Sequence, residues 1–482
     1  MPMKTLLKEL GLSVICLLAA TNTMAYDFEY EGCYFDILSE TNKTCMITYK
    51  NYHEETETYI GNFVIPGHVY YDNECYTVTA INMEAFYGCS RLTDITIPET
   101  VTIISGVAFG YCSSLKNVNI PESVTVIGGS AFEYCSSLKS ITIPKSVTDL
   151  QGSFHGCSNL TDITILGPIT YIGPFAFTDC SSLKNINIPE SVTKIRTLAF
   201  QGCSSLENIT IPKAVTEIGY AAFQGCSSLT NITIPEAVTE IGDSAFNDCS
   251  GLGNITILGD VTRMKASVFC DCYSLTDVNI LGDVTEIGKS MFKGCSSLAN
   301  ITFPESITKI GAEAFSGCSS LKSVNIPEYV TTISAGAFSG CSSLKSINIP
   351  EYVTTIGSDA FYNCSSLIDI TIPESGSVTT IGNHAFMGCS SLKSITIPET
   401  VTTIGTNAFL RCSSLTDITI PETVTTIGGG TFRYCSNLKN VNIPESVTVI
   451  GGSAFGYCSS LKSITIPESV TEIGGGAFEN CI

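Results

Sequence analysis

The chain has 482 residues, of which 44% are hydrophobic and 14% are charged, and its 24 Lys and Arg against 45 Asp and Glu give a formal net charge of -21. Nucleic acids are bound through clustered Lys and Arg, so this balance argues against a nucleic-acid partner. The acidity favours solubility and carries no information about the fold.

The first 25 residues predict a cleaved export signal. Two lysines precede a mainly apolar stretch at 10–20, and Thr23-Met24-Ala25 offers a cleavage site before Tyr26. The apolar run is shorter than the roughly 20 residues of a membrane helix, and no later stretch is long and apolar enough to span a bilayer. We therefore expect an exported chain without a transmembrane segment, either secreted or held at the cell surface.

Residues 26–80 lack the repeat that follows and predict a β-rich N-terminal cap. The stretches 30–35 and 45–49 have the aromatic and β-branched composition of short strands. A first repeat would otherwise expose its apolar face, which a cap covers. Cys33, Cys45 and Cys75 lie here, outside the repeat, and an exported protein favours one disulfide among them with the pairing undetermined.

From residue 81 to residue 482 the sequence repeats, nearly always every 23 residues. A fixed period of 20–50 residues indicates a solenoid, here of about 18 coils, in which each coil contacts only its neighbours. A Phe stands three residues before every repeat cysteine. These cysteines are Cys89, Cys112, Cys135, Cys157, Cys180, Cys203, Cys226, Cys249, Cys272, Cys295, Cys318, Cys341, Cys364, Cys389, Cys412, Cys435, Cys458 and Cys481.

Each coil predicts one short parallel strand. The pattern Leu-x-x-Ile-x-Ile-Pro at 138–144 alternates apolar and polar residues, and its Pro ends the strand. The second apolar cluster, at 124–132, lacks strand alternation and contains two glycines, so we expect a turn followed by an irregular or short helical return. The predicted fold class is an α/β-type repeat solenoid with one strand per coil.

Taken in order, Leu-x-x-Ile-x-Ile-Pro, Val-Thr-x-Ile-Gly and Ala-Phe-x-x-Cys-x-x-Leu resemble the BspA-like bacterial leucine-rich repeat family over about residues 81–482. The resemblance implies a leucine-rich repeat fold in an exported protein. It also implies attachment to host matrix glycoproteins or to other cells.

The repeat cysteines are predicted to form a buried row of thiols rather than disulfides. Equivalent side chains in stacked coils lie parallel, about 4.8 Å apart, and do not present the crossed geometry of a disulfide. Cys270 occupies a variable position beside Cys272, and we expect it to be an exposed free thiol.

The sequence predicts no catalytic, metal or cofactor site, and hence a protein that is not an enzyme. Its four histidines are scattered, and no nucleophile, base and orienting group can be assembled. A row of glutamates follows the strand-ending prolines, as at Glu99 and Glu122. It can be a solvated edge or a place where calcium gathers, and the solvated edge is favoured because calcium needs several converging oxygens.

The outward face of the predicted strands is the first candidate binding surface. Its small polar side chains can bond to one another and to water, or can form a flat surface that binds extended polymers, glycans or matrix proteins through many weak contacts. The residues that represent this face are Asn117, Asn119, Ser140, Thr142, Asp162 and Thr164.

Tyrosines between the Phe and the Cys of some coils are the second candidate. Exposed Tyr is a frequent binding anchor, and packing on the neighbouring coil is the alternative. These candidate anchors are Tyr87, Tyr111, Tyr134, Tyr362, Tyr434 and Tyr457.

The function predicted from these features is non-enzymatic, multivalent adhesion to host matrix glycoproteins, glycans or other cells through the solenoid surface. The alternative is a structural spacer or self-assembling rod. It would dock through an uncapped C-terminal coil, because the sequence stops at Cys481-Ile482 without the strand motif.

Overall fold

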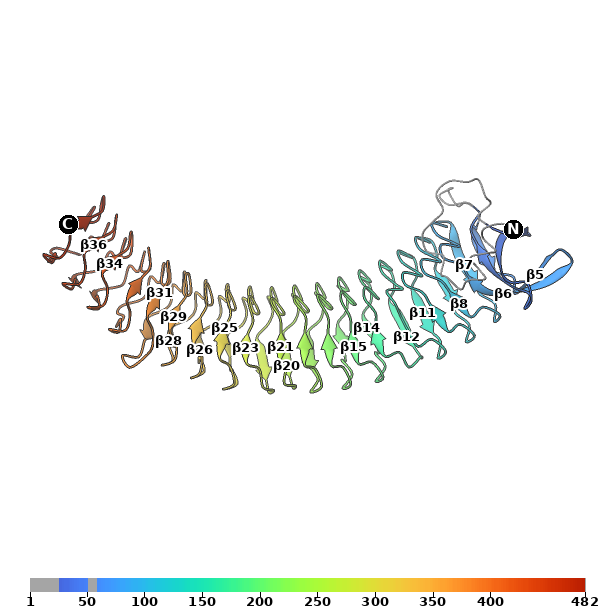
Figure 1. The fold of residues 1–482 in the computed structure, drawn as a ribbon, viewed down its shortest axis with the longest axis horizontal. Coiled ribbons are helices and arrows are strands. Elements are labelled where there is room, and N and C mark those ends of the chain that lie inside the picture. Colours follow the sequence, from blue (N-terminus) through green and yellow to red (C-terminus); the bar gives the residue numbers. More distant parts are fainter. Residues whose placement is uncertain (1–25, 51–58, 482) are drawn as a thin grey trace.

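The computed structural model describes residues 26–50 and 59–481, and the expected export signal at 1–25 lies outside them. The described chain forms a curved solenoid whose coils stack along an arc from the N-terminal to the C-terminal end (Figure 1). A solenoid of coils with parallel strands confirms the repeat architecture expected from the 23-residue period.

Six strands precede the first complete coil: β1 (Phe28–Tyr30), β2 (Cys33–Ser39), β3 (Thr44–Thr48), β4 (Gly61–Val64), β5 (His68–Tyr71) and β6 (Glu74–Ile81). They are joined to the solenoid by backbone pairing, because β6 pairs in parallel with β8 and β4 pairs in parallel with β7. The rings of Tyr59 and Phe63 lie 4.7 and 5.8 Å from that of Phe86, the first Phe of the repeat. The N-terminal strands therefore continue both sheets of the first coils.

The predicted strand row is present, with apolar side chains inward and polar ones outward. In β11 and β12 the register sets Ile141 beside Ile163 and Ser140 beside Asp162. Ile141 is buried and Ser140 is exposed, as the alternation requires. The row comprises β7 (Leu92–Thr96), β9 (Asn117–Asn119), β11 (Ser140–Ile143), β12 (Asp162–Ile165), β14 (Asn185–Ile186), β16 (Asn208–Ile209), β18 (Asn231–Ile234), β20 (Asn254–Ile257), β22 (Asp277–Ile280), β24 (Asn300–Ile301), β26 (Ser323–Val324), β28 (Ser346–Asn348), β30 (Asp369–Thr371), β33 (Asp417–Thr419) and β35 (Asn440–Asn442).

A second row of parallel strands replaces the expected irregular or helical return, so the prediction of one strand per coil was wrong. The described residues contain strands and turns but no helix, and the α/β label does not apply to them. The row comprises β8 (Ile103–Ile104), β10 (Val126–Ile127), β13 (Tyr171–Ile172), β15 (Lys194–Ile195), β17 (Glu217–Ile218), β19 (Glu240–Ile241), β21 (Arg263–Met264), β23 (Glu286–Ile287), β25 (Lys309–Ile310), β27 (Thr332–Ile333), β29 (Thr355–Ile356), β31 (Thr380–Ile381), β32 (Thr403–Ile404), β34 (Thr426–Ile427), β36 (Val449–Ile450) and β37 (Glu472–Ile473).

The physical reason for the second row is pairing between coils. Val124 and Ile127 are buried three residues apart, while the two residues between them face solvent, so the run has no period-two signal. Stacking nevertheless sets each Val-Thr-x-Ile segment against the next, and inter-coil hydrogen bonds then satisfy the backbone groups. Tertiary stacking, rather than local pattern, decides this conformation.

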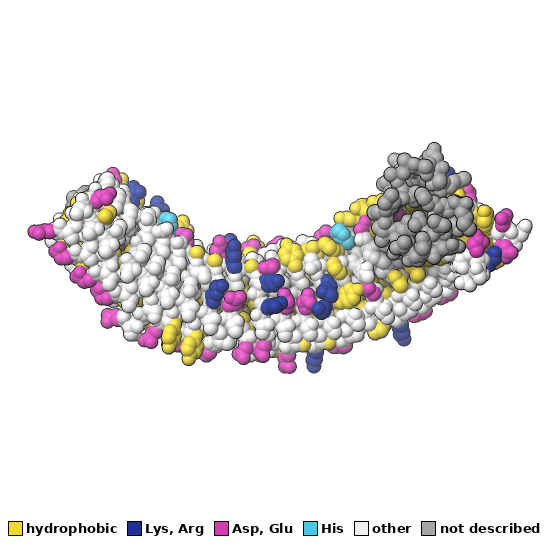
Figure 2. Space-filling view, viewed as in Figure 1, with side chains coloured by type: hydrophobic (Ala, Val, Ile, Leu, Met, Phe, Trp, Pro, Cys, Tyr) yellow, Lys and Arg dark blue, Asp and Glu magenta, His cyan; other side chains and the backbone are white. Residues whose placement is uncertain are grey.

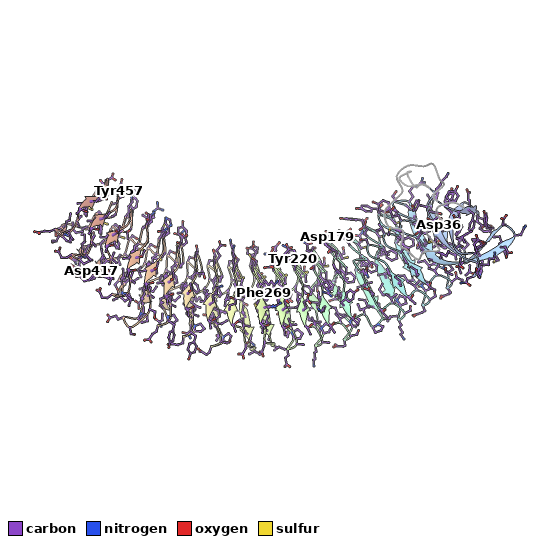
Figure 3. All side chains as sticks on the ribbon, in the orientation of Figure 1. Asp36, Asp179, Tyr220, Phe269, Asp417 and Tyr457 are labelled. Carbon is purple, nitrogen blue, oxygen red and sulfur yellow. The ribbon has the colours of Figure 1, made fainter. Side chains whose placement is uncertain are left out.

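Each coil is closed by a turn that carries the Phe and the Cys and lies beside the two strand rows. The Phe109 N–H donates to the Ala131 carbonyl of the next coil at 2.8 Å, and the same bond recurs along the array. The Phe109 and Phe132 ring centroids lie 5.1 Å apart with nearly parallel planes. An unbroken column of stacked Phe rings, all buried except half-buried Phe478, thus runs through the solenoid, and Phe269 marks its interior in Figure 3.

The row of buried thiols is confirmed, apart from half-buried Cys481. From Cys112 onward, each thiol donates to the Phe carbonyl of the preceding coil, as from Cys112 Sγ to Phe86 O at 3.0 Å. Burial raises the pKa of Cys157 to about 12, which keeps that thiol neutral.

Every cysteine in the described ranges is free. The disulfide expected among Cys33, Cys45 and Cys75 is therefore not formed. Cys270 is a free thiol as predicted, but the prediction that it is exposed was wrong, since only 8% of its surface is accessible. Its Sγ contacts Asp271 Oδ2 at 3.4 Å, and Asn247 of the preceding coil donates to its carbonyl.

Candidate functional site

The polar side chains predicted as a binding face lie together on the outer surface of the first strand row. Asn117 and Asn119 come from β9, and the other four predicted residues come from β11 and β12, where Ser140 is opposite Asp162 and Thr142 opposite Thr164. All six are exposed. Asp417 of the same row lies on the outer edge of the arc in Figure 3.

Neighbouring side chains of this face hydrogen-bond to each other from coil to coil. Asn117 Nδ2 donates to Asp94 Oδ1 at 2.8 Å, and Asn254 Nδ2 donates to Asn231 Oδ1 at 2.7 Å. The side chains that form such bonds already have polar partners. These contacts favour a face that is largely satisfied internally and by water.

The predicted tyrosines lie in the Phe–Cys turns, and five of the six come together in two stacks. Tyr87, Tyr111 and Tyr134 have successive centroid distances of 5.3 and 4.7 Å. Tyr434 and Tyr457 stack at 4.6 Å. Tyr362 is half-buried and has no aromatic partner within the part of the chain that the structure describes. The two predicted alternatives are combined, because the stacked rings pack on neighbouring coils and most remain exposed.

The C-terminal stack lies on the inner edge of the arc, and the N-terminal stack occupies the equivalent turns of its own coils. Tyr457, Tyr220 and Asp179 are all labelled along that edge in Figure 3, opposite the outer edge that carries Asp417. Hydrophobic side chains also gather along the inner edge in the N-terminal half of Figure 2. The inner edge therefore differs in chemistry from the uniformly polar first strand row.

The second position after the Phe has left-handed backbone geometry. In many coils it is Gly, as at Gly202 with φ of 70° and Gly225 with φ of 73°. Tyr111, Tyr434 and Tyr457 adopt the same geometry with φ of 60°, 64° and 66°. A bulky L-residue in this region costs roughly 1–2 kcal/mol, so its repeated use calls for a compensating role.

The N-terminal stack continues into a histidine and an acid. The Tyr134 hydroxyl lies 3.4 Å from His155 Nε2, and the same nitrogen lies 3.8 Å from Asp179 Oδ2. The pKa of Tyr111 is raised by partial desolvation and then by the charge of Glu133. This stack, Tyr87–Tyr111–Tyr134–His155, is aromatic with acidic neighbours, and we refer to it as the N-terminal stack.

The C-terminal stack is accompanied by two arginines that the sequence analysis did not single out. Arg411 Cζ lies 5.9 Å from the Tyr434 ring centroid, and Arg433 Cζ lies 5.0 and 5.4 Å from those of Tyr434 and Tyr457. Neither arginine forms an ion pair with any other described residue. The sequence signal was available, because both occupy the positions between Phe and Cys that the tyrosines also use. We call Arg411, Arg433, Tyr434 and Tyr457 the Arg–Tyr cluster.

A belt of ion pairs crosses the middle of the second strand row and is the other feature that the sequence analysis missed. Glu217 contacts Lys194 at 2.9 Å and Arg196 at 3.8 Å. Glu240, its register neighbour, contacts Arg263 at 3.5 Å and Lys265 at 3.5 Å. Figure 2 shows these charges gathered midway along the arc. Each of the two acids pairs with two bases, so all four bases have an acidic partner, and exposed pairs of this kind stabilise weakly.

Among residues 26–50 and 59–481, no group of three or more His, Cys, Asp or Glu is placed to hold a metal ion. Within the same ranges, no helix is long and apolar enough to cross a membrane. The glutamates that follow the strand-ending prolines, Glu399 and Glu422 among them, are exposed. The charged groups described thus form pairs and rows rather than a converging site.

Stacked parallel strands, an inward Leu and Ile core and a repeating coil define a leucine-rich repeat solenoid. The chain belongs to the BspA-type leucine-rich repeat family, whose repeat region matches residues 75–165, 150–276, 262–378 and 370–482. This is a family of bacterial surface proteins, and the match confirms the resemblance inferred from the sequence.

Solved structures of bacterial leucine-rich repeat proteins are similar to this chain. One is a leucine-rich repeat protein from Bacteroides ovatus ATCC 8483, 28% identical, covering 95% of this chain and 93% of that one with a TM-score of 0.57. Another is a leucine-rich cell surface protein from Faecalibacterium prausnitzii A2-165, 29% identical, covering 88% and 95% with a TM-score of 0.39. A comparison with curated protein sequences finds no match.

Proposed function

We propose that the protein is an exported, non-enzymatic binding protein that adheres to surface macromolecules through its solenoid. The observation that carries the proposal is that Tyr111, Tyr134 and Tyr434 remain exposed although their backbone conformation favours Gly. Tyr111 is 43% exposed and Tyr434 is 36% exposed. Exposed aromatic side chains that cost conformational energy are the expected mark of a binding surface.

The proposed ligands are host matrix glycoproteins, glycans or the surfaces of other cells, and the location is secreted or cell surface. Membership of a family of bacterial surface proteins supports this assignment. Near-identical coils offer the same contacts many times along the arc. Many weak contacts on one rigid body favour avidity over a single deep pocket.

The proposed organisation is a signal peptide at 1–25, an N-terminal β cap at 26–80 and the solenoid at 81–482. The cap is supported by the continuous pairing of β3, β6 and β8. It is also supported by the packing of Tyr59 and Phe63 on Phe86. Aromatic packing over the first Phe shields the end of the stacked column from water.

The test is binding of the purified chain to an array of matrix glycoproteins, mucins and polysaccharides. A variant that replaces Tyr111, Tyr134, Tyr434 and Tyr457 with Gly should lose most binding and stay folded, because Gly occupies this position in other coils. The matched control is Tyr329→Ser with Tyr352→Ser, an exposed stacked pair elsewhere on the coils, and it should bind as the parent does. Self-association without binding to any arrayed ligand would favour the structural rod.

A further inference from the structure

The Arg–Tyr cluster has the features of a built anion site, and we propose that it binds an acidic glycan through a carboxylate- or sulfate-bearing sugar unit. The inference deepens the proposed function and rests on it. In Figure 2, Lys and Arg side chains reach the inner edge of the arc near its C-terminal end. The cluster lies in three consecutive coils, which supply Arg411, then Arg433 and Tyr434, then Tyr457.

The two arginines of the cluster carry charge that no described acid neutralises. Arg196 and Arg263 of the central belt contact glutamates at 3.8 and 3.5 Å. Arg411 and Arg433 have no such partner within the described ranges, although the chain carries 45 acidic residues and a net charge of -21. Cations left unpaired in so acidic a chain are available to an external anion.

The guanidinium groups of the cluster are held against tyrosine rings. Tyr434 and Tyr457 stack with an interplanar angle of 20°, and Arg433 lies over both rings while Arg411 lies over that of Tyr434. Contact with an aromatic face restrains an arginine and leaves its in-plane N–H groups available for bidentate bonds to a carboxylate or sulfate. The side chains are thus held in place before a ligand arrives.

The cluster contains one hydrogen-bond donor without an acceptor among the described residues. The Nε atom of Arg433 is buried and has no hydrogen-bond partner among the described residues. A buried donor without a partner costs about 1–3 kcal/mol, so a shift of this side chain that brings the atom to a ligand acceptor recovers that cost. The residues that the structure describes thus leave one polar group of the cluster without an acceptor.

Three residues of the cluster have left-handed backbone conformations. Arg411, Tyr434 and Tyr457 have φ of 65°, 64° and 66°, whereas Gly takes the equivalent position at Gly340 and Gly388. Three adjacent coils therefore use bulky residues where Gly is favoured. The compensating gain is not an ion pair with another described residue, which again indicates a ligand.

Sugar chemistry fits the cluster better than a dense polyanion does. Tyrosines offer apolar ring surface together with hydroxyls, which matches the apolar C–H faces and the hydroxyls of a pyranose. The Tyr457 hydroxyl donates to Glu479 Oε1 at 3.4 Å, and that carboxylate can accept a bond from a sugar hydroxyl. Glu479 and the acidic chain repel closely spaced negative charges, whereas many acidic glycans separate their charges by neutral units.

The experiment measures equilibrium binding of the full chain to hyaluronan, chondroitin sulfate, neutral dextran and poly-glutamate at low and moderate salt. Hyaluronan separates carboxylate recognition from the sulfate present in chondroitin sulfate. We expect at least one acidic glycan to bind with salt-sensitive affinity, and dextran not to bind. Arg411→Gln and Arg433→Gln should each weaken that binding roughly tenfold or more.

Two matched sets of variants separate binding from folding. Arg196→Gln and Arg263→Gln remove the same charge from the ion-paired belt and should leave glycan binding within about twofold of the parent. Tyr434→Gly removes the ring at a position where other coils use Gly, so it should keep the thermal midpoint and lose binding.

Equal binding by the parent and the Arg411→Gln, Arg433→Gln double variant would overturn the inference. So would binding of poly-glutamate as tight as that of the glycans, because it would reveal an acidic peptide or a general anion as the ligand. If matrix glycoproteins bind the chain and no acidic glycan does, the inference is wrong and the proposed function is still supported. Absence of all binding would remove both.

Discussion

The two tyrosine stacks occupy equivalent turns of the same repeat, yet their surroundings carry opposite charge. The N-terminal stack includes Phe132-Glu133-Tyr134-Cys135, and the C-terminal stack includes Phe432-Arg433-Tyr434-Cys435. Tyr134 continues into His155 and Asp179, whereas two arginines lie over the Tyr434 ring. The fold therefore fixes where the rings lie, and one neighbouring residue per coil decides which ligand chemistry they favour.

Both stacks depend on the same interior. Phe132 stacks on Phe109 and Phe154 at 5.1 and 5.6 Å. Phe432 stacks on Phe409 and Phe455 at 5.5 and 5.4 Å. Each of these Phe side chains is fully buried. A surface comparison is meaningful because the supporting core is nearly identical at the two places.

The largest expected effect comes from removing that core beneath one stack at a time. Phe132→Ala and Phe432→Ala should each cost about 3–5 kcal/mol, because each leaves a cavity in a column of buried rings. Coils contact only their neighbours, so we expect unfolding to remain local. Phe432→Ala should make Cys412, Cys435 and Cys458 reactive to alkylation, and Phe132→Ala should instead expose Cys112, Cys135 and Cys157.

Mass spectrometry of alkylated peptides measures the reactivity of each thiol, and denaturant unfolding measures the loss of stability. In the parent, burial protects the row of repeat cysteines, while Cys75 is exposed and should react first. Phe432→Leu is the milder control and should lose less stability, since it retains most of the side-chain volume. Reactivity of both sets of thiols in either variant would mean that the array unfolds as one unit, contrary to this picture.

The next effect converts one stack into the other. Glu133→Arg creates in the N-terminal stack the tetrapeptide found at 432–435, and Tyr111 and Tyr134 are already stacked to receive a guanidinium. If the Arg–Tyr cluster binds acidic glycans, this variant should add a second site and increase the apparent affinity for a long chain about tenfold or more through avidity.

Glu133→Gln is the control, because it removes the acid without supplying a cation, and it should change the affinity little. Short glycan fragments, which cannot span both sites, should show a doubled stoichiometry and an unchanged affinity per site. No gain with long chains and one site with short fragments would show that arginine beside stacked tyrosines is not sufficient for binding.

The sequence predicted the solenoid and its first strand row because both have strong local signals. A 23-residue period, inward alternation at Leu138, Ile141 and Ile143, and the following Pro144 specify a stacked strand and its end. The second row was missed because Val124 and Ile127 are separated by two outward residues, and that spacing lacks the period-two alternation of a strand. Its strands exist through contacts with coils 23 residues away, as between Ile127 and Ile104.

The tyrosine positions were predicted, but their grouping was only partly visible. Register alone indicates that Tyr434 and Tyr457 are neighbours, whereas the placement of Arg433 over both rings requires side-chain coordinates. The burial of Cys270 was missed for a similar reason, because its cover comes from adjacent coils. Variable positions cannot be assigned to solvent without knowing how neighbouring side chains fold over them.

A smaller effect tests how closely the tyrosines fit their neighbouring coils. A Cβ added at Gly156 would lie 2.5 Å from Cδ1 of Tyr134, whereas one at Gly225 would have its nearest atom at 3.8 Å. Both glycines have left-handed φ, so each Ala variant costs about 1 kcal/mol of backbone strain. Gly156→Ala should cost more than Gly225→Ala and should alter Tyr134 fluorescence. Equal unfolding free energies for the two variants would show that Tyr134 moves aside freely.

The smallest effect concerns the outer face, where the two ends are alike. The Asn117 amide lowers the pKa of Asp94, and the Asn440 amide lowers that of Asp417, in each case with help from the preceding Thr hydroxyl. A carboxyl whose pKa is lowered by folding stabilises the folded state above its unfolded pKa near 4, and this contribution disappears as the pH falls through the lowered value.

Asn440→Ala should therefore raise the pKa of Asp417 toward its ordinary value, as measured by NMR titration of the carboxyl carbon. Its small loss of stability should be present at neutral pH and absent in strong acid, with Asn117→Ala behaving in parallel at Asp94. Glycan binding should be unchanged in both variants, because this row lies on the outer edge, away from the Arg–Tyr cluster. A loss of binding in Asn440→Ala alone would place the difference between the two ends on the polar face rather than on the inner edge.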